Sequence, residues 1–153
     1  MTPNASESFR FVGYPVRVHA GPDAISKLAE EVDRAGAQRV LVVCGRSIIS
    51  NTDLVARVKD SLGERVAGVF SGGKTGSPLT SVLEGVAAAR EANSDGIIAI
   101  GGGSAVVTAR GITILLAEKG TAQELCTQYP EGKPSVSPRL MAPKTPNFSV
   151  LTT

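Results

Sequence analysis

Hydrophobic residues along the chain occur in two alternating patterns. Short continuous apolar runs are typical of parallel strands that are covered on both faces, and apolar residues that recur every three or four positions are typical of helices. The predicted strands span residues 39–44, 66–70 and 96–100, and the predicted helices span residues 23–36, 52–62, 79–92 and 104–118. This alternation predicts an α/β fold of the Rossmann-like, doubly wound type: a mostly parallel sheet with helices on both faces.

Two further strands are expected at the ends of this alternation. Val16, Val18 and Ala20 alternate with polar residues, which predicts a first strand that ends at Gly21. A short last strand is expected at residues 149–152.

The predicted helices have candidate caps and core-facing sides. Asp23 can cap the first helix and Asn51 or Thr52 the second, since their side-chain oxygens accept hydrogen bonds from free amides, and Gly36 is a natural stop. The residues expected to face the core are Ile25, Leu28, Ala29 and Val32, then Leu54, Val55, Val58 and Leu62, then Val82, Leu83, Val86 and Ala89.

The 153 residues have the length of one domain. We expect residues 1–10 to form a short N-terminal arm and residues 11–153 to form the domain itself. Residues 120–147 hold five of the nine prolines, which exclude a long helix or a central strand. A long surface loop is therefore expected there.

Composition excludes several kinds of partner. With 42% hydrophobic residues and a net charge of only +2, the chain offers no electrostatic reason to bind nucleic acid or an anionic membrane. No apolar run approaches the ~20 residues that a membrane span needs. Cys44 and Cys126 are far apart and lack CxxC spacing, which favours two reduced thiols in a cytoplasmic protein.

The strongest chemical signal is a glycine turn between a buried strand and a helix. Gly101, Gly102 and Gly103 lack a Cβ, so the backbone can approach a phosphate closely, and Ser104 adds a hydroxyl. The first turn of a helix has free N–H groups and a partial positive charge, which suit a pyrophosphate. The turn departs from GxGxxG, because Val106 stands at the last glycine position, and a tight turn without a ligand is the alternative.

Residues 68–75 also match the Walker A pattern GxxxxGK[ST]. The strand predicted at residues 66–70 occupies the positions that a phosphate loop should fill. No helix can begin at Lys74 and Thr75, because Gly76, Ser77 and Pro78 follow. We therefore interpret this match as accidental.

The segment GGGSAVVTAR at residues 101–110 resembles the GGGSxxDxAK motif of the iron-containing (group III) alcohol dehydrogenases. The first four positions and Ala109 match, Arg110 replaces lysine, and Val107 stands where the family usually has aspartate. The resemblance extends over residues 11–153, and the relatives in this family include maleylacetate reductase, lactaldehyde reductase and glycerol dehydrogenase. It implies the N-terminal nucleotide-binding domain of this family and a small-molecule dinucleotide as its ligand.

The resemblance further implies a cofactor, NAD or NADP, that exchanges hydride with a metal-bound alcohol or carbonyl. In the family a carboxylate often follows the second strand and binds the adenosine ribose. Gly45 stands at that position and Arg46 follows, so a 2′-phosphate would meet no repulsion and a nearby guanidinium. The hypothesis is that NADP is accepted at least as well as NAD; the alternative is that Arg46 is only a solvated charge.

The family holds Fe or Zn with an aspartate and three histidines of a helical C-terminal domain. The chain has a single histidine, His19, which we expect to make an ordinary hydrogen bond on a strand. We therefore expect no metal ligand and no catalytic residue in this chain, a C-terminal metal-binding domain absent from it, and no activity of the chain alone. It is either a fragment or a natural stand-alone domain, and an uncovered apolar face could drive formation of a homo-oligomer.

Two other functions remain open at this point. The same turn could serve a non-catalytic module that binds a nucleotide or a sugar phosphate. A fragment of an enzyme similar to dehydroquinate synthase, which shares this architecture, is the other alternative.

Overall fold

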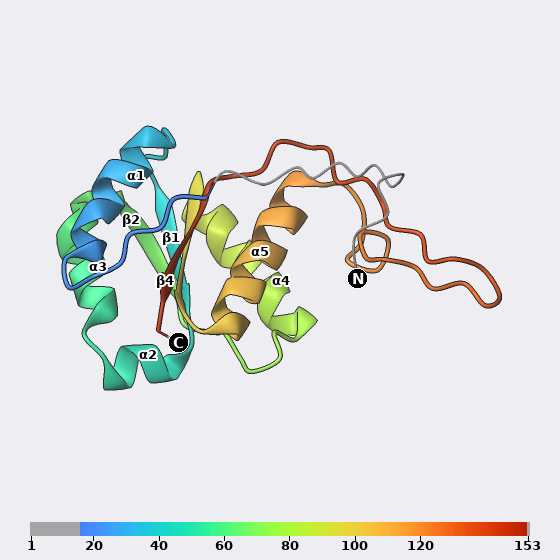
Figure 1. Ribbon diagram of the computed structural model, residues 1–153, viewed down its shortest axis with the longest axis horizontal. Helices are drawn as coiled ribbons and strands as arrows, with labels where there is room; N and C mark the ends of the chain where they lie inside the picture. Colours follow the sequence, from blue (N-terminus) through green and yellow to red (C-terminus); the bar gives the residue numbers. More distant parts are fainter. Residues whose placement is uncertain (1–15, 153) are drawn as a thin grey trace, which may run out of the picture.

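A computed structural model describes residues 16–152, in which a four-stranded parallel sheet lies between two layers of helices (Figure 1). The strands are β1 (Val40–Cys44), β2 (Val66–Phe70), β3 (Gly96–Gly101) and β4 (Asn147–Leu151), arranged in the order β2-β1-β3-β4. Every neighbouring pair is parallel. The predicted α/β fold is thus confirmed; the predicted N-terminal arm lies outside the described residues.

Helices connect the strands and cover both faces of the sheet (Figure 1). The elements are the 3-10 helices η1 (Ala24–Lys27) and η2 (Gly63–Arg65), and the α-helices α1 (Leu28–Arg34), α2 (Arg46–Asn51), α3 (Leu54–Leu62), α4 (Leu79–Glu91) and α5 (Gly103–Ala117). Helices α1 and α3 pack on one face, and α4 and α5 pack on the other. Between α5 and β4 the described chain has neither helix nor strand beyond one isolated bridge that pairs Gln128 with Val136.

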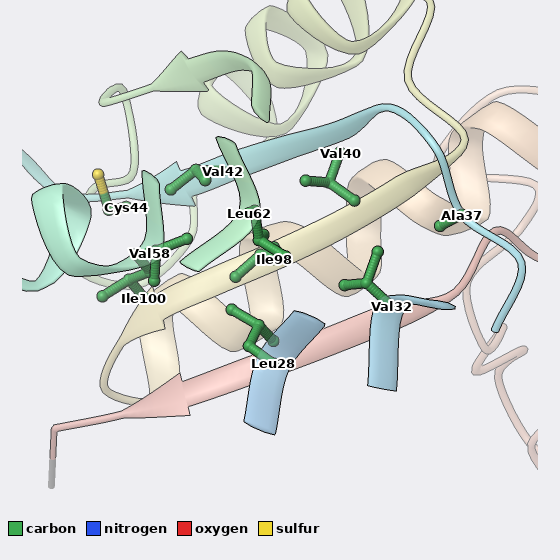
Figure 2. Close-up of a cluster of buried hydrophobic side chains, with 10 residues drawn as sticks. All are labelled: Leu28, Val32, Ala37, Val40, Val42, Cys44, Val58, Leu62, Ile98 and Ile100. Carbon is green, nitrogen blue, oxygen red and sulfur yellow. The ribbon is translucent and has the colours of Figure 1, made fainter. Parts of the chain in front are cut away.

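The continuous apolar runs form strands because both of their faces are buried. Side chains of a strand point alternately to the two faces, so Val40, Val42 and Cys44 of β1 join the cluster under α1 and α3 (Figure 2). Leu41 and Val43 join the cluster under α4 and α5. Every residue of β1 and β3 is buried, which explains why the central strands lack polar positions.

Strands β1 and β3 pair in a regular register. Their five residue pairs extend from Val40 with Gly96 to Cys44 with Ile100 without an irregularity. The β1–β2 pairing, by contrast, shifts register next to Val40. Because β1 and β3 end at the same height, the turns that follow them lie side by side.

The strand predicted at residues 16–20 is wrong, because this segment has no strand conformation. Val16 and Val18 are 75% and 80% exposed, so their alternation buries nothing. The segment instead contacts α1 through polar groups: His19 Nε2 lies 3.1 Å from Glu31 Oε1, and Arg17 Nη1 lies 3.8 Å from Glu31 Oε2. An alternating pattern forms a strand only beside a partner strand, and none of the four described strands pairs with residues 16–20.

Two local predictions about helices are also wrong, and one short helix was not predicted. Asp23 occupies the N-cap position of η1, but its side chain accepts no capping hydrogen bond. The helix predicted at residues 52–62 is α3, which begins at Leu54, and the amide of Leu54 donates a hydrogen bond to Thr52 Oγ1; the separate short helix α2 before it was not predicted. Leu83 is 51% exposed, and Gly85 is buried in the inward stripe of α4 instead. Strand β4 begins two residues before the predicted start.

Candidate functional site

The candidate site lies at the carboxyl ends of β1 and β3. The chain passes from β1 to β2 on one side and then to β3 on the other side of β1. Where a strand order reverses in this way, the connecting segments diverge and leave a crevice beyond the strand ends, which is where open α/β sheets bind ligands. Gly45 follows β1, and Gly101 ends β3, so the fold brings the two groups of predicted site residues to this crevice.

Gly101 has a backbone conformation that requires glycine. Its φ is +140°, and a Cβ at this position would lie 3.1 Å from the Cβ of Ala105. The residue is buried, and its carbonyl oxygen accepts a hydrogen bond from the amide of Thr152. The turn out of β3 therefore depends on the missing side chain.

Gly102 and Gly103 open the 15-residue helix α5 toward solvent. Gly102 is the N-cap and Gly103 the first helical residue, one position before the predicted start. A Cβ at Gly103 would meet no atom within 4 Å. Among the described residues, the amides of Gly103 and Ser104 donate to no protein acceptor, as first-turn amides have no intrahelical partner. An open cradle of free amides at a helix start fits a phosphate or pyrophosphate.

Ser104 joins this turn to another segment instead of capping its own helix. Its Oγ accepts a hydrogen bond from the amide of Gly76 at 3.3 Å. Its carbonyl oxygen accepts one from the hydroxyl of Ser77 at 2.8 Å. A hydroxyl that accepts from Gly76 still has its own proton to donate, so Ser104 can bind a phosphate oxygen at the same time.

We call residues 71–78, between β2 and α4, the strap. Gly72 forms an isolated antiparallel β-bridge with Gly45, and the amide of Gly73 donates a hydrogen bond to the carbonyl oxygen of Cys44 at 3.0 Å. A Cβ at Gly73 would lie 2.8 Å from that oxygen, so only glycine permits the contact. The backbone of the strap thus contacts the backbone at the carboxyl end of β1. Sequence reasoning missed it as part of the site; the paired glycines 72 and 73 were the available signal.

The Walker A match is accidental, as the sequence predicted. Gly68 lies within β2, at a position where a phosphate loop would need to turn. Helix α4 begins at Leu79, well after Lys74 and Thr75, with Pro78 as its N-cap. A phosphate loop leads directly into a helix, so that its backbone amides lie at the start of that helix. Residues 68–73 do not lead into a helix in this way.

Gly45 and Arg46 lie on the other side of the crevice from α5. A Cβ at Gly45 would be 3.2 Å from the carbonyl oxygen of Gly73, so the strap restricts the space for a side chain there. Arg46 is the first residue of α2 and is exposed. Its guanidinium makes no ion pair with any residue of the described part of the chain.

Residues 16–152 do not fit a metal ion of the Fe or Zn type. They contain no cluster of three or more His, Cys, Asp or Glu side chains. His19 forms a hydrogen bond with the Glu31 carboxylate, and this hydrogen bond lowers the pKa of Glu31. A catalytic metal site needs about three protein ligands, so no step of metal chemistry can be derived from these residues.

Two surface hollows lie away from the glycine turn. One of about 470 Å³ lies between the start of α4 and residues 122–128, and one of about 320 Å³ lies along β2 and the end of α4. Neither contains a group of converging catalytic side chains. None of the described helices is long and apolar enough to cross a lipid bilayer.

A parallel sheet with a reversed strand order, a glycine turn at the reversal and a helix opening toward solvent defines a Rossmann-like α/β domain. The chain belongs to the iron-containing alcohol dehydrogenase family, whose model matches residues 15–153. This confirms the resemblance that the GGGS segment indicated.

Relatives of known activity are oxidoreductases by name. Maleylacetate reductase 2 of Cupriavidus pinatubonensis is 37% identical over 101 residues, which are 66% of this chain and 27% of that protein. Lactaldehyde reductase of Escherichia coli is 33% identical over 131 residues, 82% of this chain and 33% of that protein. The chain therefore spans about a third or less of the length of these relatives.

Solved structures show the same fold. A 1,3-propanediol oxidoreductase matches with a TM-score of 0.70 at 26% identity, over 87% of this chain and 33% of its own. The NADH-dependent butanol dehydrogenase A of Thermotoga maritima matches with a TM-score of 0.69 at 25% identity, over 94% of this chain and 34% of its own. A sulfoacetaldehyde reductase of Bifidobacterium kashiwanohense in complex with NAD+ has a TM-score of 0.75 at 18% identity, over 96% and 37% of the two chains.

Proposed function

We propose that residues 11–153 form the NAD(P)-binding domain of an alcohol dehydrogenase or reductase of the iron-containing family. The observation that carries this proposal is the pair of amides at Gly103 and Ser104, at the start of α5, which have no protein acceptor among the described residues. The name of the Thermotoga maritima relative, an NADH-dependent dehydrogenase, supports a nicotinamide dinucleotide as the ligand.

Each predicted site residue has a role in this proposal. Gly101 turns the chain, and Gly102, Gly103 and Ser104 hold the pyrophosphate with backbone amides and a hydroxyl. Gly45 and Arg46 adjoin the adenosine ribose, beyond β1. A nicotinamide cofactor supplies the hydride chemistry when bound, and the chain binds and orients it.

The cofactor in this proposal is NADP at least as much as NAD. A carboxylate beside the ribose would repel a 2′-phosphate, and Gly45 supplies none. The exposed guanidinium of Arg46 can donate two parallel hydrogen bonds to a phosphate. Both features favour the 2′-phosphorylated cofactor.

Residues 16–152 contain no cluster of three or more potential metal ligands, so we expect these residues by themselves to oxidise no alcohol at a measurable rate. In the proposed protein, the Fe or Zn that polarises the substrate oxygen is held by residues of a further domain. The free thiols of Cys44 and Cys126 agree with a reducing compartment such as the cytoplasm.

Calorimetric titration of the chain with NAD, NADP and ADP-ribose tests the proposal. ADP-ribose lacks the nicotinamide but retains the pyrophosphate, so it should bind as well. A Gly102→Arg variant fills the cradle and should abolish binding, whereas Thr80→Arg in the exposed first turn of α4 should leave it unchanged. A chain that binds none of the three compounds is not a dinucleotide-binding domain.

A further inference from the structure

Lys74 lies on the strap beside the end of β1. Its neighbour Gly73 donates a hydrogen bond from its amide to the carbonyl oxygen of Cys44, and consecutive Cα atoms are about 3.8 Å apart. Arg46 follows Cys44 by two residues on β1's own continuation. Two cations from different segments therefore lie within two residues of the backbone contact between Cys44 and Gly73.

The position of Lys74 is restrained on both sides. Before it, Gly72 bridges Gly45 and Gly73 bonds to Cys44. After it, the amide of Gly76 donates to Ser104 Oγ. Lys74 is therefore carried on a segment tied to both β1 and α5, although the residue itself is exposed.

Neither cation is neutralised by the protein itself. Within the described part of the chain, every ion pair uses other residues, and no side-chain hydrogen bond involves Lys74 or Arg46. The adjacent residue 45 is a glycine, so no carboxylate at that position compensates them. Cations on neighbouring segments repel each other unless an anion compensates them.

We propose that Lys74 determines cofactor specificity by binding, together with Arg46, the 2′-phosphate of NADP. This inference rests on the proposed function. Arg46 supplies a planar fork for two phosphate oxygens, and the ammonium of Lys74 supplies a compact charge from the strap. Gly45 contributes no carboxylate that would compete with a phosphate for these cations.

The test compares Lys74→Met with the matched control Lys59→Met, which removes an exposed lysine from α3. Dissociation constants are measured for NADP and NAD by calorimetry. Lys74→Met should weaken NADP about tenfold and change NAD less than twofold, since a charge-assisted hydrogen bond to the 2′-phosphate is lost. Lys74→Arg should restore most of the NADP affinity, and Lys59→Met should change neither cofactor.

Other outcomes overturn the inference in distinguishable ways. An equal loss of NAD and NADP affinity in Lys74→Met would place Lys74 at the pyrophosphate or in the folding of the strap. Unchanged NADP affinity would exclude a role in cofactor binding. If the unaltered chain binds NAD but Lys74→Met does not change the NADP to NAD ratio, the specificity role fails while the proposed function stands; if the unaltered chain binds neither cofactor, both fail.

Discussion

The hydroxyl oxygen of Ser104 accepts a hydrogen bond from the backbone amide of Gly76 at 3.3 Å. This bond joins the first turn of α5 to the strap, and the hydroxyl of Ser77 adds a second bond to the carbonyl of Ser104. Residues that are 28 positions apart in the chain therefore form one rim of the crevice. The position of the strap should then depend on the same side chain that meets the phosphate.

Replacement of Ser104 by alanine removes both functions of its hydroxyl. We expect dinucleotide affinity to fall about three- to tenfold, which corresponds to the usual contribution of one or two hydrogen bonds. The amide of Gly76 should also exchange its hydrogen faster, because its acceptor is lost. Calorimetry and amide exchange measure the two effects; Ser50→Ala, on the exposed side of α2, is the control. Normal affinity in Ser104→Ala would contradict the role of this hydroxyl.

Replacement of Gly103 by aspartate separates stability from binding. A carboxylate in the first turn of α5 interacts favourably with the helix dipole, by about 0.3–1 kcal/mol, and a Cβ at Gly103 meets no other atom within 4 Å. The melting temperature should therefore stay the same or rise. Dinucleotide binding should be lost, because the carboxylate repels a phosphate.

The matched control for this change is Thr80→Asp, in the first turn of α4. It should give a similar stability effect with unchanged binding. Full dinucleotide affinity in the Gly103→Asp variant would show that the phosphates bind elsewhere.

Replacement of Gly101 by alanine should destabilise the fold. At φ +140° an alanine is strained, and its Cβ would lie 3.1 Å from that of Ala105. We expect the free energy of unfolding to fall by about 1–3 kcal/mol. Urea unfolding measures the change, and Gly103→Ala is the comparison, because its Cβ would lie in open space within a helix. Equal stability of the two variants would contradict a special conformation at Gly101.

Acid should loosen the attachment of the proline-rich loop to α5. Lys144 donates a hydrogen bond to the Glu118 carboxylate, and Ala142 donates another from its amide, so the pKa of Glu118 is lowered from its ordinary value of 4.5. A carboxyl with a lowered pKa stabilises the fold above its unfolded-state pKa, and this contribution is lost as pH falls through the lower folded-state pKa. The stabilisation should thus be complete at pH 7, begin to decrease near pH 4.5 and be lost as the pH falls further through the lowered pKa of folded Glu118.

Thermal unfolding of Glu118→Gln from pH 7 down to pH 3 checks this prediction. The variant should melt below the unaltered chain at pH 7, and the two melting temperatures should converge at low pH. Glu131→Gln, at an exposed position of the same loop, should behave as the unaltered chain throughout. A difference that persists unchanged to pH 3 would show that the charge of Glu118 is not responsible.

The central strands were predictable because their residues obey one dominant constraint. The bounds of the central strands β1 and β3 agree with the prediction within a residue. The half-buried edge strand β2 also has its predicted bounds, Val66–Phe70. Burial on both faces requires apolar residues at every position of a central strand, and this pattern is visible without knowledge of the neighbours. The glycine turn was predictable for the same reason, since it directly follows such a strand.

The errors concern features that depend on residues distant in sequence. The alternation of Val16 and Val18 indicates a strand, but only a partner strand could make it one. Helix α2 escaped prediction because its six residues are too few to show a periodic stripe. The strap became part of the candidate site through hydrogen bonds to Cys44 and Ser104; the paired glycines 72 and 73 indicate a close backbone contact, but the sequence does not name the partner residues.

Because β1 and β3 pair in a regular register, the relative positions of Gly45 and the Gly101 turn depend on the lengths of these two strands. One residue inserted into β3 would move its terminal glycines by about 3.3 Å and would turn the following side chains to the opposite face. Residues added to the far ends of α4 or α5 would leave that edge undisturbed. Variation in this domain should therefore accumulate as longer or shorter helices and loops, while insertions and deletions in the two central strands should be eliminated.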